Sequence, residues 1–373
     1  MNVSKRRGSA AVLMMLIPPL LAQPTPSPTA TDDTYGRGRA IVADIDRIVT
    51  PHGIDETFDV TLGSARQLVN VRGADRANPI LLFVHGGPGA VEMPIAWSFQ
   101  RPWEDFFTVV QWDQRGAGRS YRLEDPEKIG PTMKPERYRD DAIELIELLC
   151  RKYGKSKLFL LGHSWGSVVG LSVAAKRPDL LYAYVGMGQV IDFQENERLG
   201  FDWTLARAHE DKNAEAVTAL EALRPYPAPG GLDKEKMSVE RKWNIYYGGL
   251  AWGRTNGDFY FHAGRLSPLY TAADRKAWDD GSDLSIKHLW SQLGGVSFKN
   301  LHDISVPVIL LLGRHDYTAP APIAESWLNE LKAPKKAIVW FENSAHLPML
   351  EEPGHTLAAL LEQVRPLAEE KLR

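Results

Sequence analysis

The chain contains 373 residues, 44% of them hydrophobic, with a formal net charge of −3 from 44 basic and 47 acidic side chains. This composition can supply either one large core or a core with a sizeable insertion. Because no basic stripe is visible, nucleic-acid binding has little support. The single cysteine, Cys150, excludes an internal disulfide and is predicted to be a core residue, because it falls in an apolar helical pattern.

The N-terminal segment differs in composition from the rest of the chain. Basic residues at positions 5–7 precede an apolar run at 10–22, which ends on a small residue. This order is typical of a secretory signal peptide, so we predict that residues 1–22 direct export and that residues 23–40, rich in Pro, Thr and Ser, begin the mature protein as a disordered linker. The run is shorter than the about 20 residues that span a bilayer, so we expect no stable membrane insertion after signal removal. An uncleaved anchor and the twin-arginine export route are the alternatives.

From about residue 56, short apolar segments alternate with helical patterns. Two segments rich in β-formers predict an opening hairpin, and β-branched apolar runs that end in glycine loops predict buried strands. In chain order the predicted elements are the hairpin 56–62 and 66–73, strands 79–87 and 106–116, helix 136–153, strand 157–164, helix 165–178 and strand 180–190.

The alternation stops at residue 192 and resumes near residue 301. The interrupting segment contains helical stretches, a turn-rich segment and many aromatic residues, but no convincing buried strand. Strand–helix alternation predicts an α/β fold, with a mainly parallel sheet covered by helices on both faces. The predicted later elements are strand 306–316, helix 321–332, strand 336–346 and a final helix, and the predicted divisions are a first core half 41–191, a helical cap 192–300 and a second core half 301–373.

One serine has the context of a nucleophile. Ser164 lies in Gly-His-Ser-Trp-Gly between a predicted strand and a predicted helix. A sharp turn at this point crowds the backbone, so both flanking positions must be small, and Gly162 and Gly166 meet that need. A serine hydroxyl also requires a base that accepts its proton.

The acid and the histidine of such a site must follow the serine, each just after a strand. Asp316 and His346 do so, and the order Ser164, Asp316, His346 predicts a catalytic triad. Asp303 is the alternative acid, but it precedes its strand. His315 is the rival histidine, but it would have to bond the carboxylate of its own neighbour.

A tetrahedral intermediate needs two backbone N–H groups aimed at its negative oxygen. One donor is predicted to be Trp165, the residue after the nucleophile, and the other comes from the loop 85–90. Glycines in that loop let the backbone approach the substrate. We predict Gly87 as the donor, with Gly86 behind it.

Five segments together resemble one known family. HGGPG, DQRGAGRS and GHSWGS, followed by GRHDYTAP and SAHLPMLEEP, are similar to segments of the proline iminopeptidase family of α/β-hydrolases. The resemblance covers about residues 56–190 and 301–365. It implies removal of an N-terminal residue, often proline, from small peptides. It also implies these roles: Ser164 as nucleophile, His346 as base, Asp316 as the group that orients the base, and Gly87 and Trp165 as oxyanion donors.

The chain departs from this family in two places. The family commonly has glycine where His163 stands, and the family's cap segment with paired tryptophan and glutamate is absent. Because proline-specific members hold the substrate's amino group with acidic cap residues, Glu195 and Glu197 are candidates for that role, and the alternative is two solvated charges on a helix face. The cap's aromatic residues are expected either to line an apolar pocket or to form the cap's own core. Three charged residues are expected to brace loops near the site: Asp113, Arg115 and Arg119.

Three functional hypotheses follow. The first is an exported aminopeptidase of the proline iminopeptidase type that acts on small peptides through an acyl-enzyme. The second is an esterase, amidase or lactonase on the same scaffold, and the third is a non-catalytic binding module. No metal and no other cofactor is predicted, because metal-ligand motifs are missing and GMGQVI lacks the third glycine of a dinucleotide loop. The exact substrate and the oligomeric state are left open.

Overall fold

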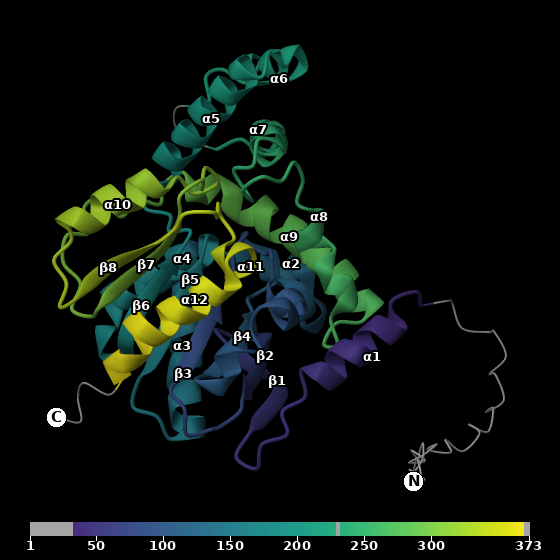
Figure 1. Cartoon of the computed structure of the whole chain (residues 1–373), viewed down its shortest axis with the longest axis vertical. Coiled ribbons are helices and arrows are strands. Elements are labelled where there is room, and N and C mark those ends of the chain that lie inside the picture. The colour runs from purple at the N-terminus through teal and green to yellow at the C-terminus, as the bar shows by residue number, and fades with distance from the viewer. Residues whose placement is uncertain (1–32, 229–231, 369–373) are drawn as a thin grey trace, which may run out of the picture. The chain divides into compact units, whose positions relative to one another are not determined.

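The computed structural model describes residues 33–228 and 232–368 (Figure 1). The sheet and the helices described below belong to one compact unit that begins at Tyr35. The predicted signal peptide, residues 1–22, lies outside the described residues. Within the described part of the chain, no helix has both the length and the apolar character needed to span a membrane.

Eight strands form one sheet in the order β1-β2-β4-β3-β5-β6-β7-β8. The predicted hairpin is present as the antiparallel pair β1–β2; β2 is also antiparallel to β4, and all other neighbours are parallel. The prediction of an α/β fold with a mainly parallel sheet is therefore confirmed. The strands are β1 (Ile54–Leu62), β2 (Ala65–Gly73), β3 (Ile80–Val84), β4 (Thr108–Asp113), β5 (Leu158–His163), β6 (Leu181–Met187), β7 (Val308–Gly313) and β8 (Lys336–Phe341).

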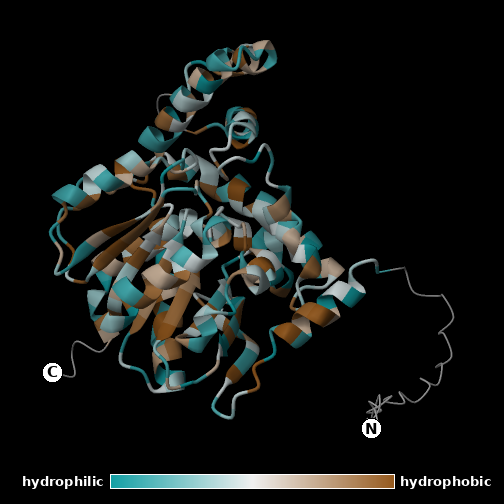
Figure 2. Ribbon diagram, in the orientation of Figure 1, coloured by the Kyte–Doolittle hydropathy of each residue, from teal (hydrophilic) through white to brown (hydrophobic). Residues whose placement is uncertain are grey.

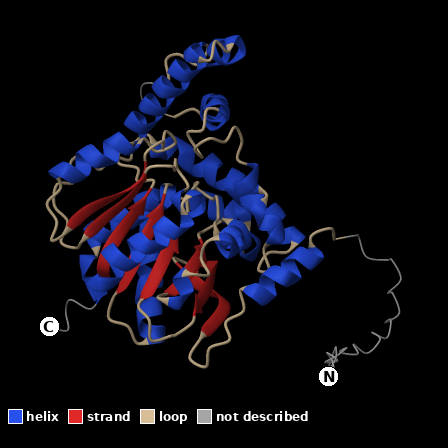
Figure 3. Ribbon diagram, in the orientation of Figure 1, coloured by secondary structure: helices blue, strands red, loops and turns tan. Residues whose placement is uncertain are grey.

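Helices cover both faces of this sheet (Figure 3), and its central strands are apolar on both sides (Figure 2). Side chains alternate along a strand, so Leu82 and Val84 of β3 pack with α3, α4 and α10, while Leu81 and Phe83 pack in a second cluster with α12. Cys150 is buried in the first cluster, as predicted. The core helices are α2 (Pro126–Ile129), α3 (Pro135–Tyr153), α4 (Trp165–Lys176), α10 (Ala321–Glu330), α11 (Pro348–Glu351) and α12 (Pro353–Ala359).

The chain between β6 and β7 forms helices, and the described residues of this segment contribute no strand to the sheet. Three of these helices, α5, α6 and α7, share a small core of their own, to which Trp243 contributes, whereas Tyr260 and Phe261 line the cavity described below. Both expectations for the cap aromatics therefore hold in part. The helices are α5 (Phe193–Glu210), α6 (Ala214–Glu221), α7 (Lys234–Tyr246), α8 (Asp258–Phe261) and α9 (Ala272–Leu293).

Helix α1 (Gly36–Ile45) occupies the end of the segment predicted as a linker. The prediction of disorder for 23–40 is wrong at residues 36–40, and residues 23–32 lie outside the described part of the chain. The helix packs against the cap, where Gly38 comes so close to Leu266 that an added Cβ would lie 2.7 Å from its side chain. This tertiary contact, which the composition does not reveal, stabilises the helix.

Candidate active site

Ser164 lies at the turn between β5 and α4, in the strand–turn–helix context predicted from the sequence. Its backbone angles, φ 55° and ψ −121°, are rare for a residue with a side chain. A Cβ at Gly162 would lie 2.3 Å from the carbonyl oxygen of Gly166, and one at Gly166 would lie 1.9 Å from the carbonyl oxygen of Val84. Only glycine fits at either flank, and the resulting turn presents Ser164 to a cavity.

Asp316 and His346 follow β7 and β8 and meet beside this turn. Nδ1 of His346 lies 2.8 Å from Oδ2 of Asp316, and the two residues are 3% and 2% exposed. The other oxygen of Asp316 accepts hydrogen bonds from the backbone N–H groups of Thr318 and Ala319, at 3.0 and 2.7 Å. The carboxylate is thus fixed from both sides, and His346 lines the same cavity as Ser164.

The alternative acid and histidine lie elsewhere. Asp303 is exposed and pairs through its backbone with Lys332 ahead of β7. The ring of His315 stacks on Trp252, with centroids 3.5 Å apart. Neither Asp303 nor His315 is among the described residues that line the cavity.

The predicted oxyanion residues Gly86, Gly87 and Trp165 all line the cavity with Ser164. Trp165 is the first residue of α4, so its N–H has no acceptor within the helix. Gly87 has φ 110°, and a Cβ at Gly86 would lie 3.0 Å from the Cβ of Ser164. The loop thus approaches Ser164 closely, as an oxyanion hole beside that residue would require.

Gln114 connects the two sides of this proposed hole. Its side-chain amide donates to the carbonyl oxygen of His85 at 2.9 Å and accepts from the indole N–H of Trp165 at 3.0 Å. The sequence analysis missed this residue, although it stands inside the quoted segment DQRGAGRS. The available signal was an amide near the carboxyl end of the predicted strand 106–116.

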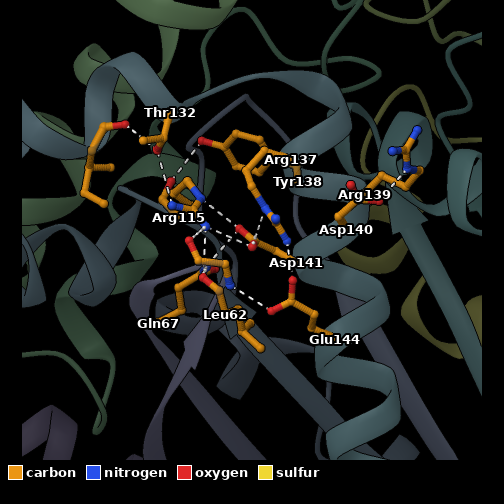
Figure 4. A network of polar contacts seen from close by, with 12 residues as sticks. Leu62, Gln67, Arg115, Thr132, Arg137, Tyr138, Arg139, Asp140, Asp141 and Glu144 are labelled. Carbon is orange, nitrogen blue, oxygen red and sulfur yellow. Dashed lines mark hydrogen bonds and ion pairs between the residues drawn. The ribbon is translucent and has the colours of Figure 1, made fainter.

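Arg115, in the loop after β4, lies at the centre of a network of polar contacts (Figure 4). Its Nε and Nη2 donate to the two carboxylate oxygens of Asp141 at 2.8 and 2.9 Å, and Nη2 also donates to the carbonyl oxygen of Leu62. Arg137 donates to the same carboxylate at 2.9 Å. This buried network joins α3 to the β1–β2 turn and agrees with the predicted bracing role.

Asp113 and Arg119 brace the same loop on its other side. Oδ2 of Asp113 accepts from the backbone N–H of Arg119 at 2.8 Å and from the hydroxyl of Tyr270, which precedes α9. Burial raises the pKa of Asp113 to about 7. The loop is thereby joined to the cap.

The cavity that contains Ser164 and His346 has a volume of about 280 Å³. Its wall is mainly apolar and comes from both the core and the cap, so it suits a small substrate with an apolar group. The apolar lining includes Val190, Phe193, Met237, Ile245, Leu250, Phe261, Ile286, Trp290 and Leu347.

The two predicted cap carboxylates have different surroundings. Glu195 does not reach the cavity: it pairs with Arg198 at 2.6 Å and lines a separate surface hollow beside Lys299, so its candidacy is corrected. Glu197 lines the cavity and is 2% exposed. Two helical positions that are two apart point in roughly opposite directions, so only one of the pair can face the site.

A comparison with protein families gives one match, the α/β hydrolase fold, over residues 79–353. The chain belongs to the α/β-hydrolase fold family.

Individual relatives narrow this assignment. The hydrolase is 33% identical over 298 residues to the probable aminopeptidase YbaC of Bacillus subtilis (strain 168), covering 79% of this chain and 92% of the relative. It is 24% identical over 314 residues to the proline iminopeptidase of Saccharolobus solfataricus, covering 79% and 87%. The crystal structure of a proline iminopeptidase from Mycobacterium smegmatis shares the fold, with a TM-score of 0.60 and 22% identity over 85% of this chain and 99% of that one. The resemblance inferred from the motifs is confirmed.

The hydrolase also carries cap residues that the sequence analysis missed. Glu197 accepts hydrogen bonds from Nη2 of Arg241, at 2.8 Å, and from the hydroxyl of Tyr226. Glu240 is buried next to this group, with Oε2 lying 3.6 Å from Nη1 of Arg241, and burial raises the pKa of Glu240 to about 7. For Arg241, burial lowers the pKa, but the two carboxylates outweigh this effect and the pKa is raised.

Proposed function

We propose that this chain is a serine hydrolase in which Ser164 is the nucleophile, His346 the base and Asp316 the group that orients the base. The observation that carries the proposal is the buried 2.8 Å contact between His346 Nδ1 and Asp316 Oδ2, at the wall of the cavity that Ser164 also lines. Because Nδ1–H donates to the carboxylate, Nε2 is left as the acceptor that a serine proton requires.

The mechanism follows from this arrangement. His346 takes the proton of Ser164 as its oxygen attacks the substrate carbonyl, and the N–H groups of Gly87 and Trp165 stabilise the oxyanion. His346 then gives the proton to the leaving amine or alcohol as its bond to the carbonyl carbon breaks, which leaves an acyl ester on Ser164. Water, deprotonated by His346, attacks this ester and restores the serine.

The substrate class we favour is a small peptide with a free N-terminal amino group. The similarity to the probable aminopeptidase YbaC supports this choice. Glu197 in the cavity wall and Glu240 behind it carry two negative charges against the one positive charge of Arg241 when Glu240 is ionised. The net charge of −1 attracts an ammonium group.

A second candidate is an esterase, amidase or lactonase activity on substrates without an amine. One observation favours it: both carboxylate oxygens of Glu197 already accept hydrogen bonds, from Arg241 and Tyr226. An amine must share or displace one of these partners, whereas an apolar acyl group needs neither.

The first experiment treats the purified protein and its Ser164→Ala variant with a fluorescent fluorophosphonate. We expect the wild-type protein to be labelled and the variant not, because only an activated serine reacts. Equal labelling of the two proteins would remove Ser164 from the proposal.

The second experiment separates the two substrate classes. Proline and other aminoacyl arylamides are compared with their N-acetyl derivatives and with short-chain nitrophenyl esters. We expect acetylation to abolish turnover of the preferred arylamide. If acetylation has no effect, or if only esters react, the aminopeptidase assignment fails and the second candidate replaces it.

We also propose that the protein is exported, on the basis of the basic, apolar and small residues in order at 5–22. The test compares the compartments reached by the full chain and by a chain that lacks residues 1–22. If both proteins are found in the same compartment, the proposal is wrong.

A further inference from the structure

His163, the residue directly before Ser164, is buried and takes no part in the mechanism above. Its Nδ1 lies 2.5 Å from Oε1 of Glu92, and its Nε2 lies 2.9 Å from the backbone carbonyl oxygen of His346. A carbonyl oxygen only accepts hydrogen bonds, so Nε2 carries a hydrogen. When the carboxylate of Glu92 is ionised it also only accepts, so Nδ1 then carries a second hydrogen and the ring is positively charged.

His85, buried in the neighbouring loop, provides a contrast. Its Nδ1 donates to the carbonyl oxygen of Gly86 at 2.9 Å, while its Nε2 accepts from the backbone N–H of Gln114 at 3.2 Å. One donor and one acceptor fit a neutral ring, and burial lowers the pKa of His85 to about 4. Burial also lowers the pKa of His163, but the charge and hydrogen bond of Glu92 outweigh it, and the pKa is raised.

The burial of the Glu92 carboxylate also favours a cation beside it. Glu92 is fully buried just after the loop 85–90, and no described residue donates a hydrogen bond to its Oε2. Among the described residues, its Oε1 contacts His163 and the neutral hydroxyl of Tyr260 from the cap, the latter at 3.3 Å. A buried carboxylate without a cation is strongly unfavourable. Of its two side-chain partners, only His163 can supply a positive charge.

The remaining ionisable groups near His163 do not compete for this role. The ring of His346 lies 4.9 Å from that of His163, between centroids, and is itself bonded to Asp316. Asp316 adds a further negative charge that favours a cation at His163. His85 is the neutral ring described above.

We propose that His163 is a permanently protonated imidazolium, ion-paired with Glu92, that positions the catalytic histidine. Its Nε2–H donates a hydrogen bond to the backbone carbonyl oxygen of His346, and Ser164 follows His163 directly in the chain. One hydrogen bond thus joins the strand of the nucleophile to the loop of the base. A neutral ring has one N–H, and it would keep both bonds only if a protonated Glu92 donated its O–H to Nδ1. The kinetic consequence rests on the proposed serine-hydrolase function, whereas the charge state does not.

The charge state can be measured without any assumption about activity. The full-length protein is labelled with 15N-histidine, and two-bond 15N–1H spectra are recorded up to about pH 9, well above the ordinary histidine pKa of about 6.5. We expect the ring of His163 to remain doubly protonated at this pH. The doubly protonated signal should disappear in His163→Gln and titrate to neutral in Glu92→Gln. If no imidazolium persists at this pH in the wild-type protein, the proposal is wrong.

Stability gives a second measurement. His163→Gln leaves the charge of Glu92 buried and unpaired, so adding Glu92→Gln should raise the melting temperature of that variant. His85→Gln is the matched control, since its ring is neutral, and adding Glu92→Gln to it should give no rise. If the rise is absent in the first pair, or equal in both pairs, the ion pair is refuted.

The kinetic readout tests positioning. A displaced base lowers the rate of the chemical step, so His163→Gln should reduce kcat by about 10- to 100-fold with little change in KM. Unchanged kcat would refute the positioning role. Failure of the fluorophosphonate to label the wild-type protein would instead refute the serine-hydrolase proposal and leave the imidazolium result standing.

Discussion

Replacing Asp113 by asparagine is expected to make the protein more stable at alkaline pH. Asp113 is fully buried, and its Oδ2 accepts hydrogen bonds from Arg119 and Tyr270. Within residues 33–228 and 232–368, its Oδ1 has no hydrogen-bond partner. Burial raises the pKa of this carboxyl from 3.8 to about 7. Between these values the folded protein holds a proton that the unfolded chain has released, so the free energy of unfolding decreases as the pH rises through this window.

The magnitude follows from the size of the shift. A change in the pKa from 3.8 to about 7 lowers the free energy of unfolding of the wild-type protein by about 4 kcal/mol. This loss is complete above about pH 7. Asparagine has the shape of the protonated carboxyl, keeps an acceptor for Arg119 and Tyr270, and does not ionise. Near pH 4 the two proteins should therefore be about equally stable, and near pH 8 Asp113→Asn should be more stable by about 4 kcal/mol.

The assay is urea unfolding of both proteins in steps from pH 4 to pH 8, with the difference in unfolding free energy plotted against pH. Asp140→Asn is the control of opposite sign. Hydrogen bonds from Arg139 and Lys176 lower the pKa of Asp140 to about 2. The ionised carboxylate therefore stabilises the folded protein above the ordinary pKa of 3.8, and at pH 8 Asp140→Asn should be less stable than the wild-type protein. A difference for Asp113→Asn that does not change with pH would refute the reasoning.

Three further predictions concern the site. Asp316→Asn should lower kcat on the order of 10³- to 10⁴-fold in steady-state assays, because the amide no longer fixes the imidazole tautomer; a loss below tenfold would contradict the proposed triad. Gly166→Ala should melt well below the wild-type protein, because its Cβ would lie 1.9 Å from the carbonyl oxygen of Val84, whereas Gly354→Ala, with nothing within 4 Å, should melt close to it. Glu197→Gln should raise KM for substrates with a free amine by about tenfold while leaving KM for nitrophenyl esters unchanged; an equal rise for both would indicate damage to the fold instead of a lost amine contact.

The sheet and the turn at Ser164 could be predicted because their signals are local. Apolar β-branched runs mark buried strands, and crowding at positions 162 and 166 leaves room only for glycine. Asp316 and His346 could be placed because the ends of neighbouring parallel strands meet at one edge of a sheet, and β7 and β8 are such neighbours.

The cap was harder to predict because its contacts depend on which face of each helix turns inward. Nothing in the sequence sets the rotation of α5, so Glu195 and Glu197 were equivalent candidates until the structure separated them. Arg241, the partner of Glu197, lies 44 positions later on another helix. Amphipathic spacing does not encode a pairing over that distance.

His163 illustrates the same limit inside the core. The sequence shows it only as a departure from a family pattern. Its charge state depends on Glu92, 71 positions earlier, and on a carbonyl oxygen 183 positions later, which approach the ring only in the folded chain.

The cap of this hydrolase is hydrogen-bonded to the segments that carry Asp316 and His346, the proposed catalytic residues. The carbonyl oxygen of Leu250 accepts a hydrogen bond from the backbone N–H of His346 at 3.0 Å, and the side chains of Asn196 and Asn244 donate to the carbonyl oxygens of Thr318 and Tyr317, next to Asp316. A cap transplanted from a relative, by recombination or by engineering, must reproduce these three contacts as well as supply a new pocket wall. We expect grafts that keep residues 196, 244 and 250 and change only the other side chains of the cavity wall to retain all three contacts.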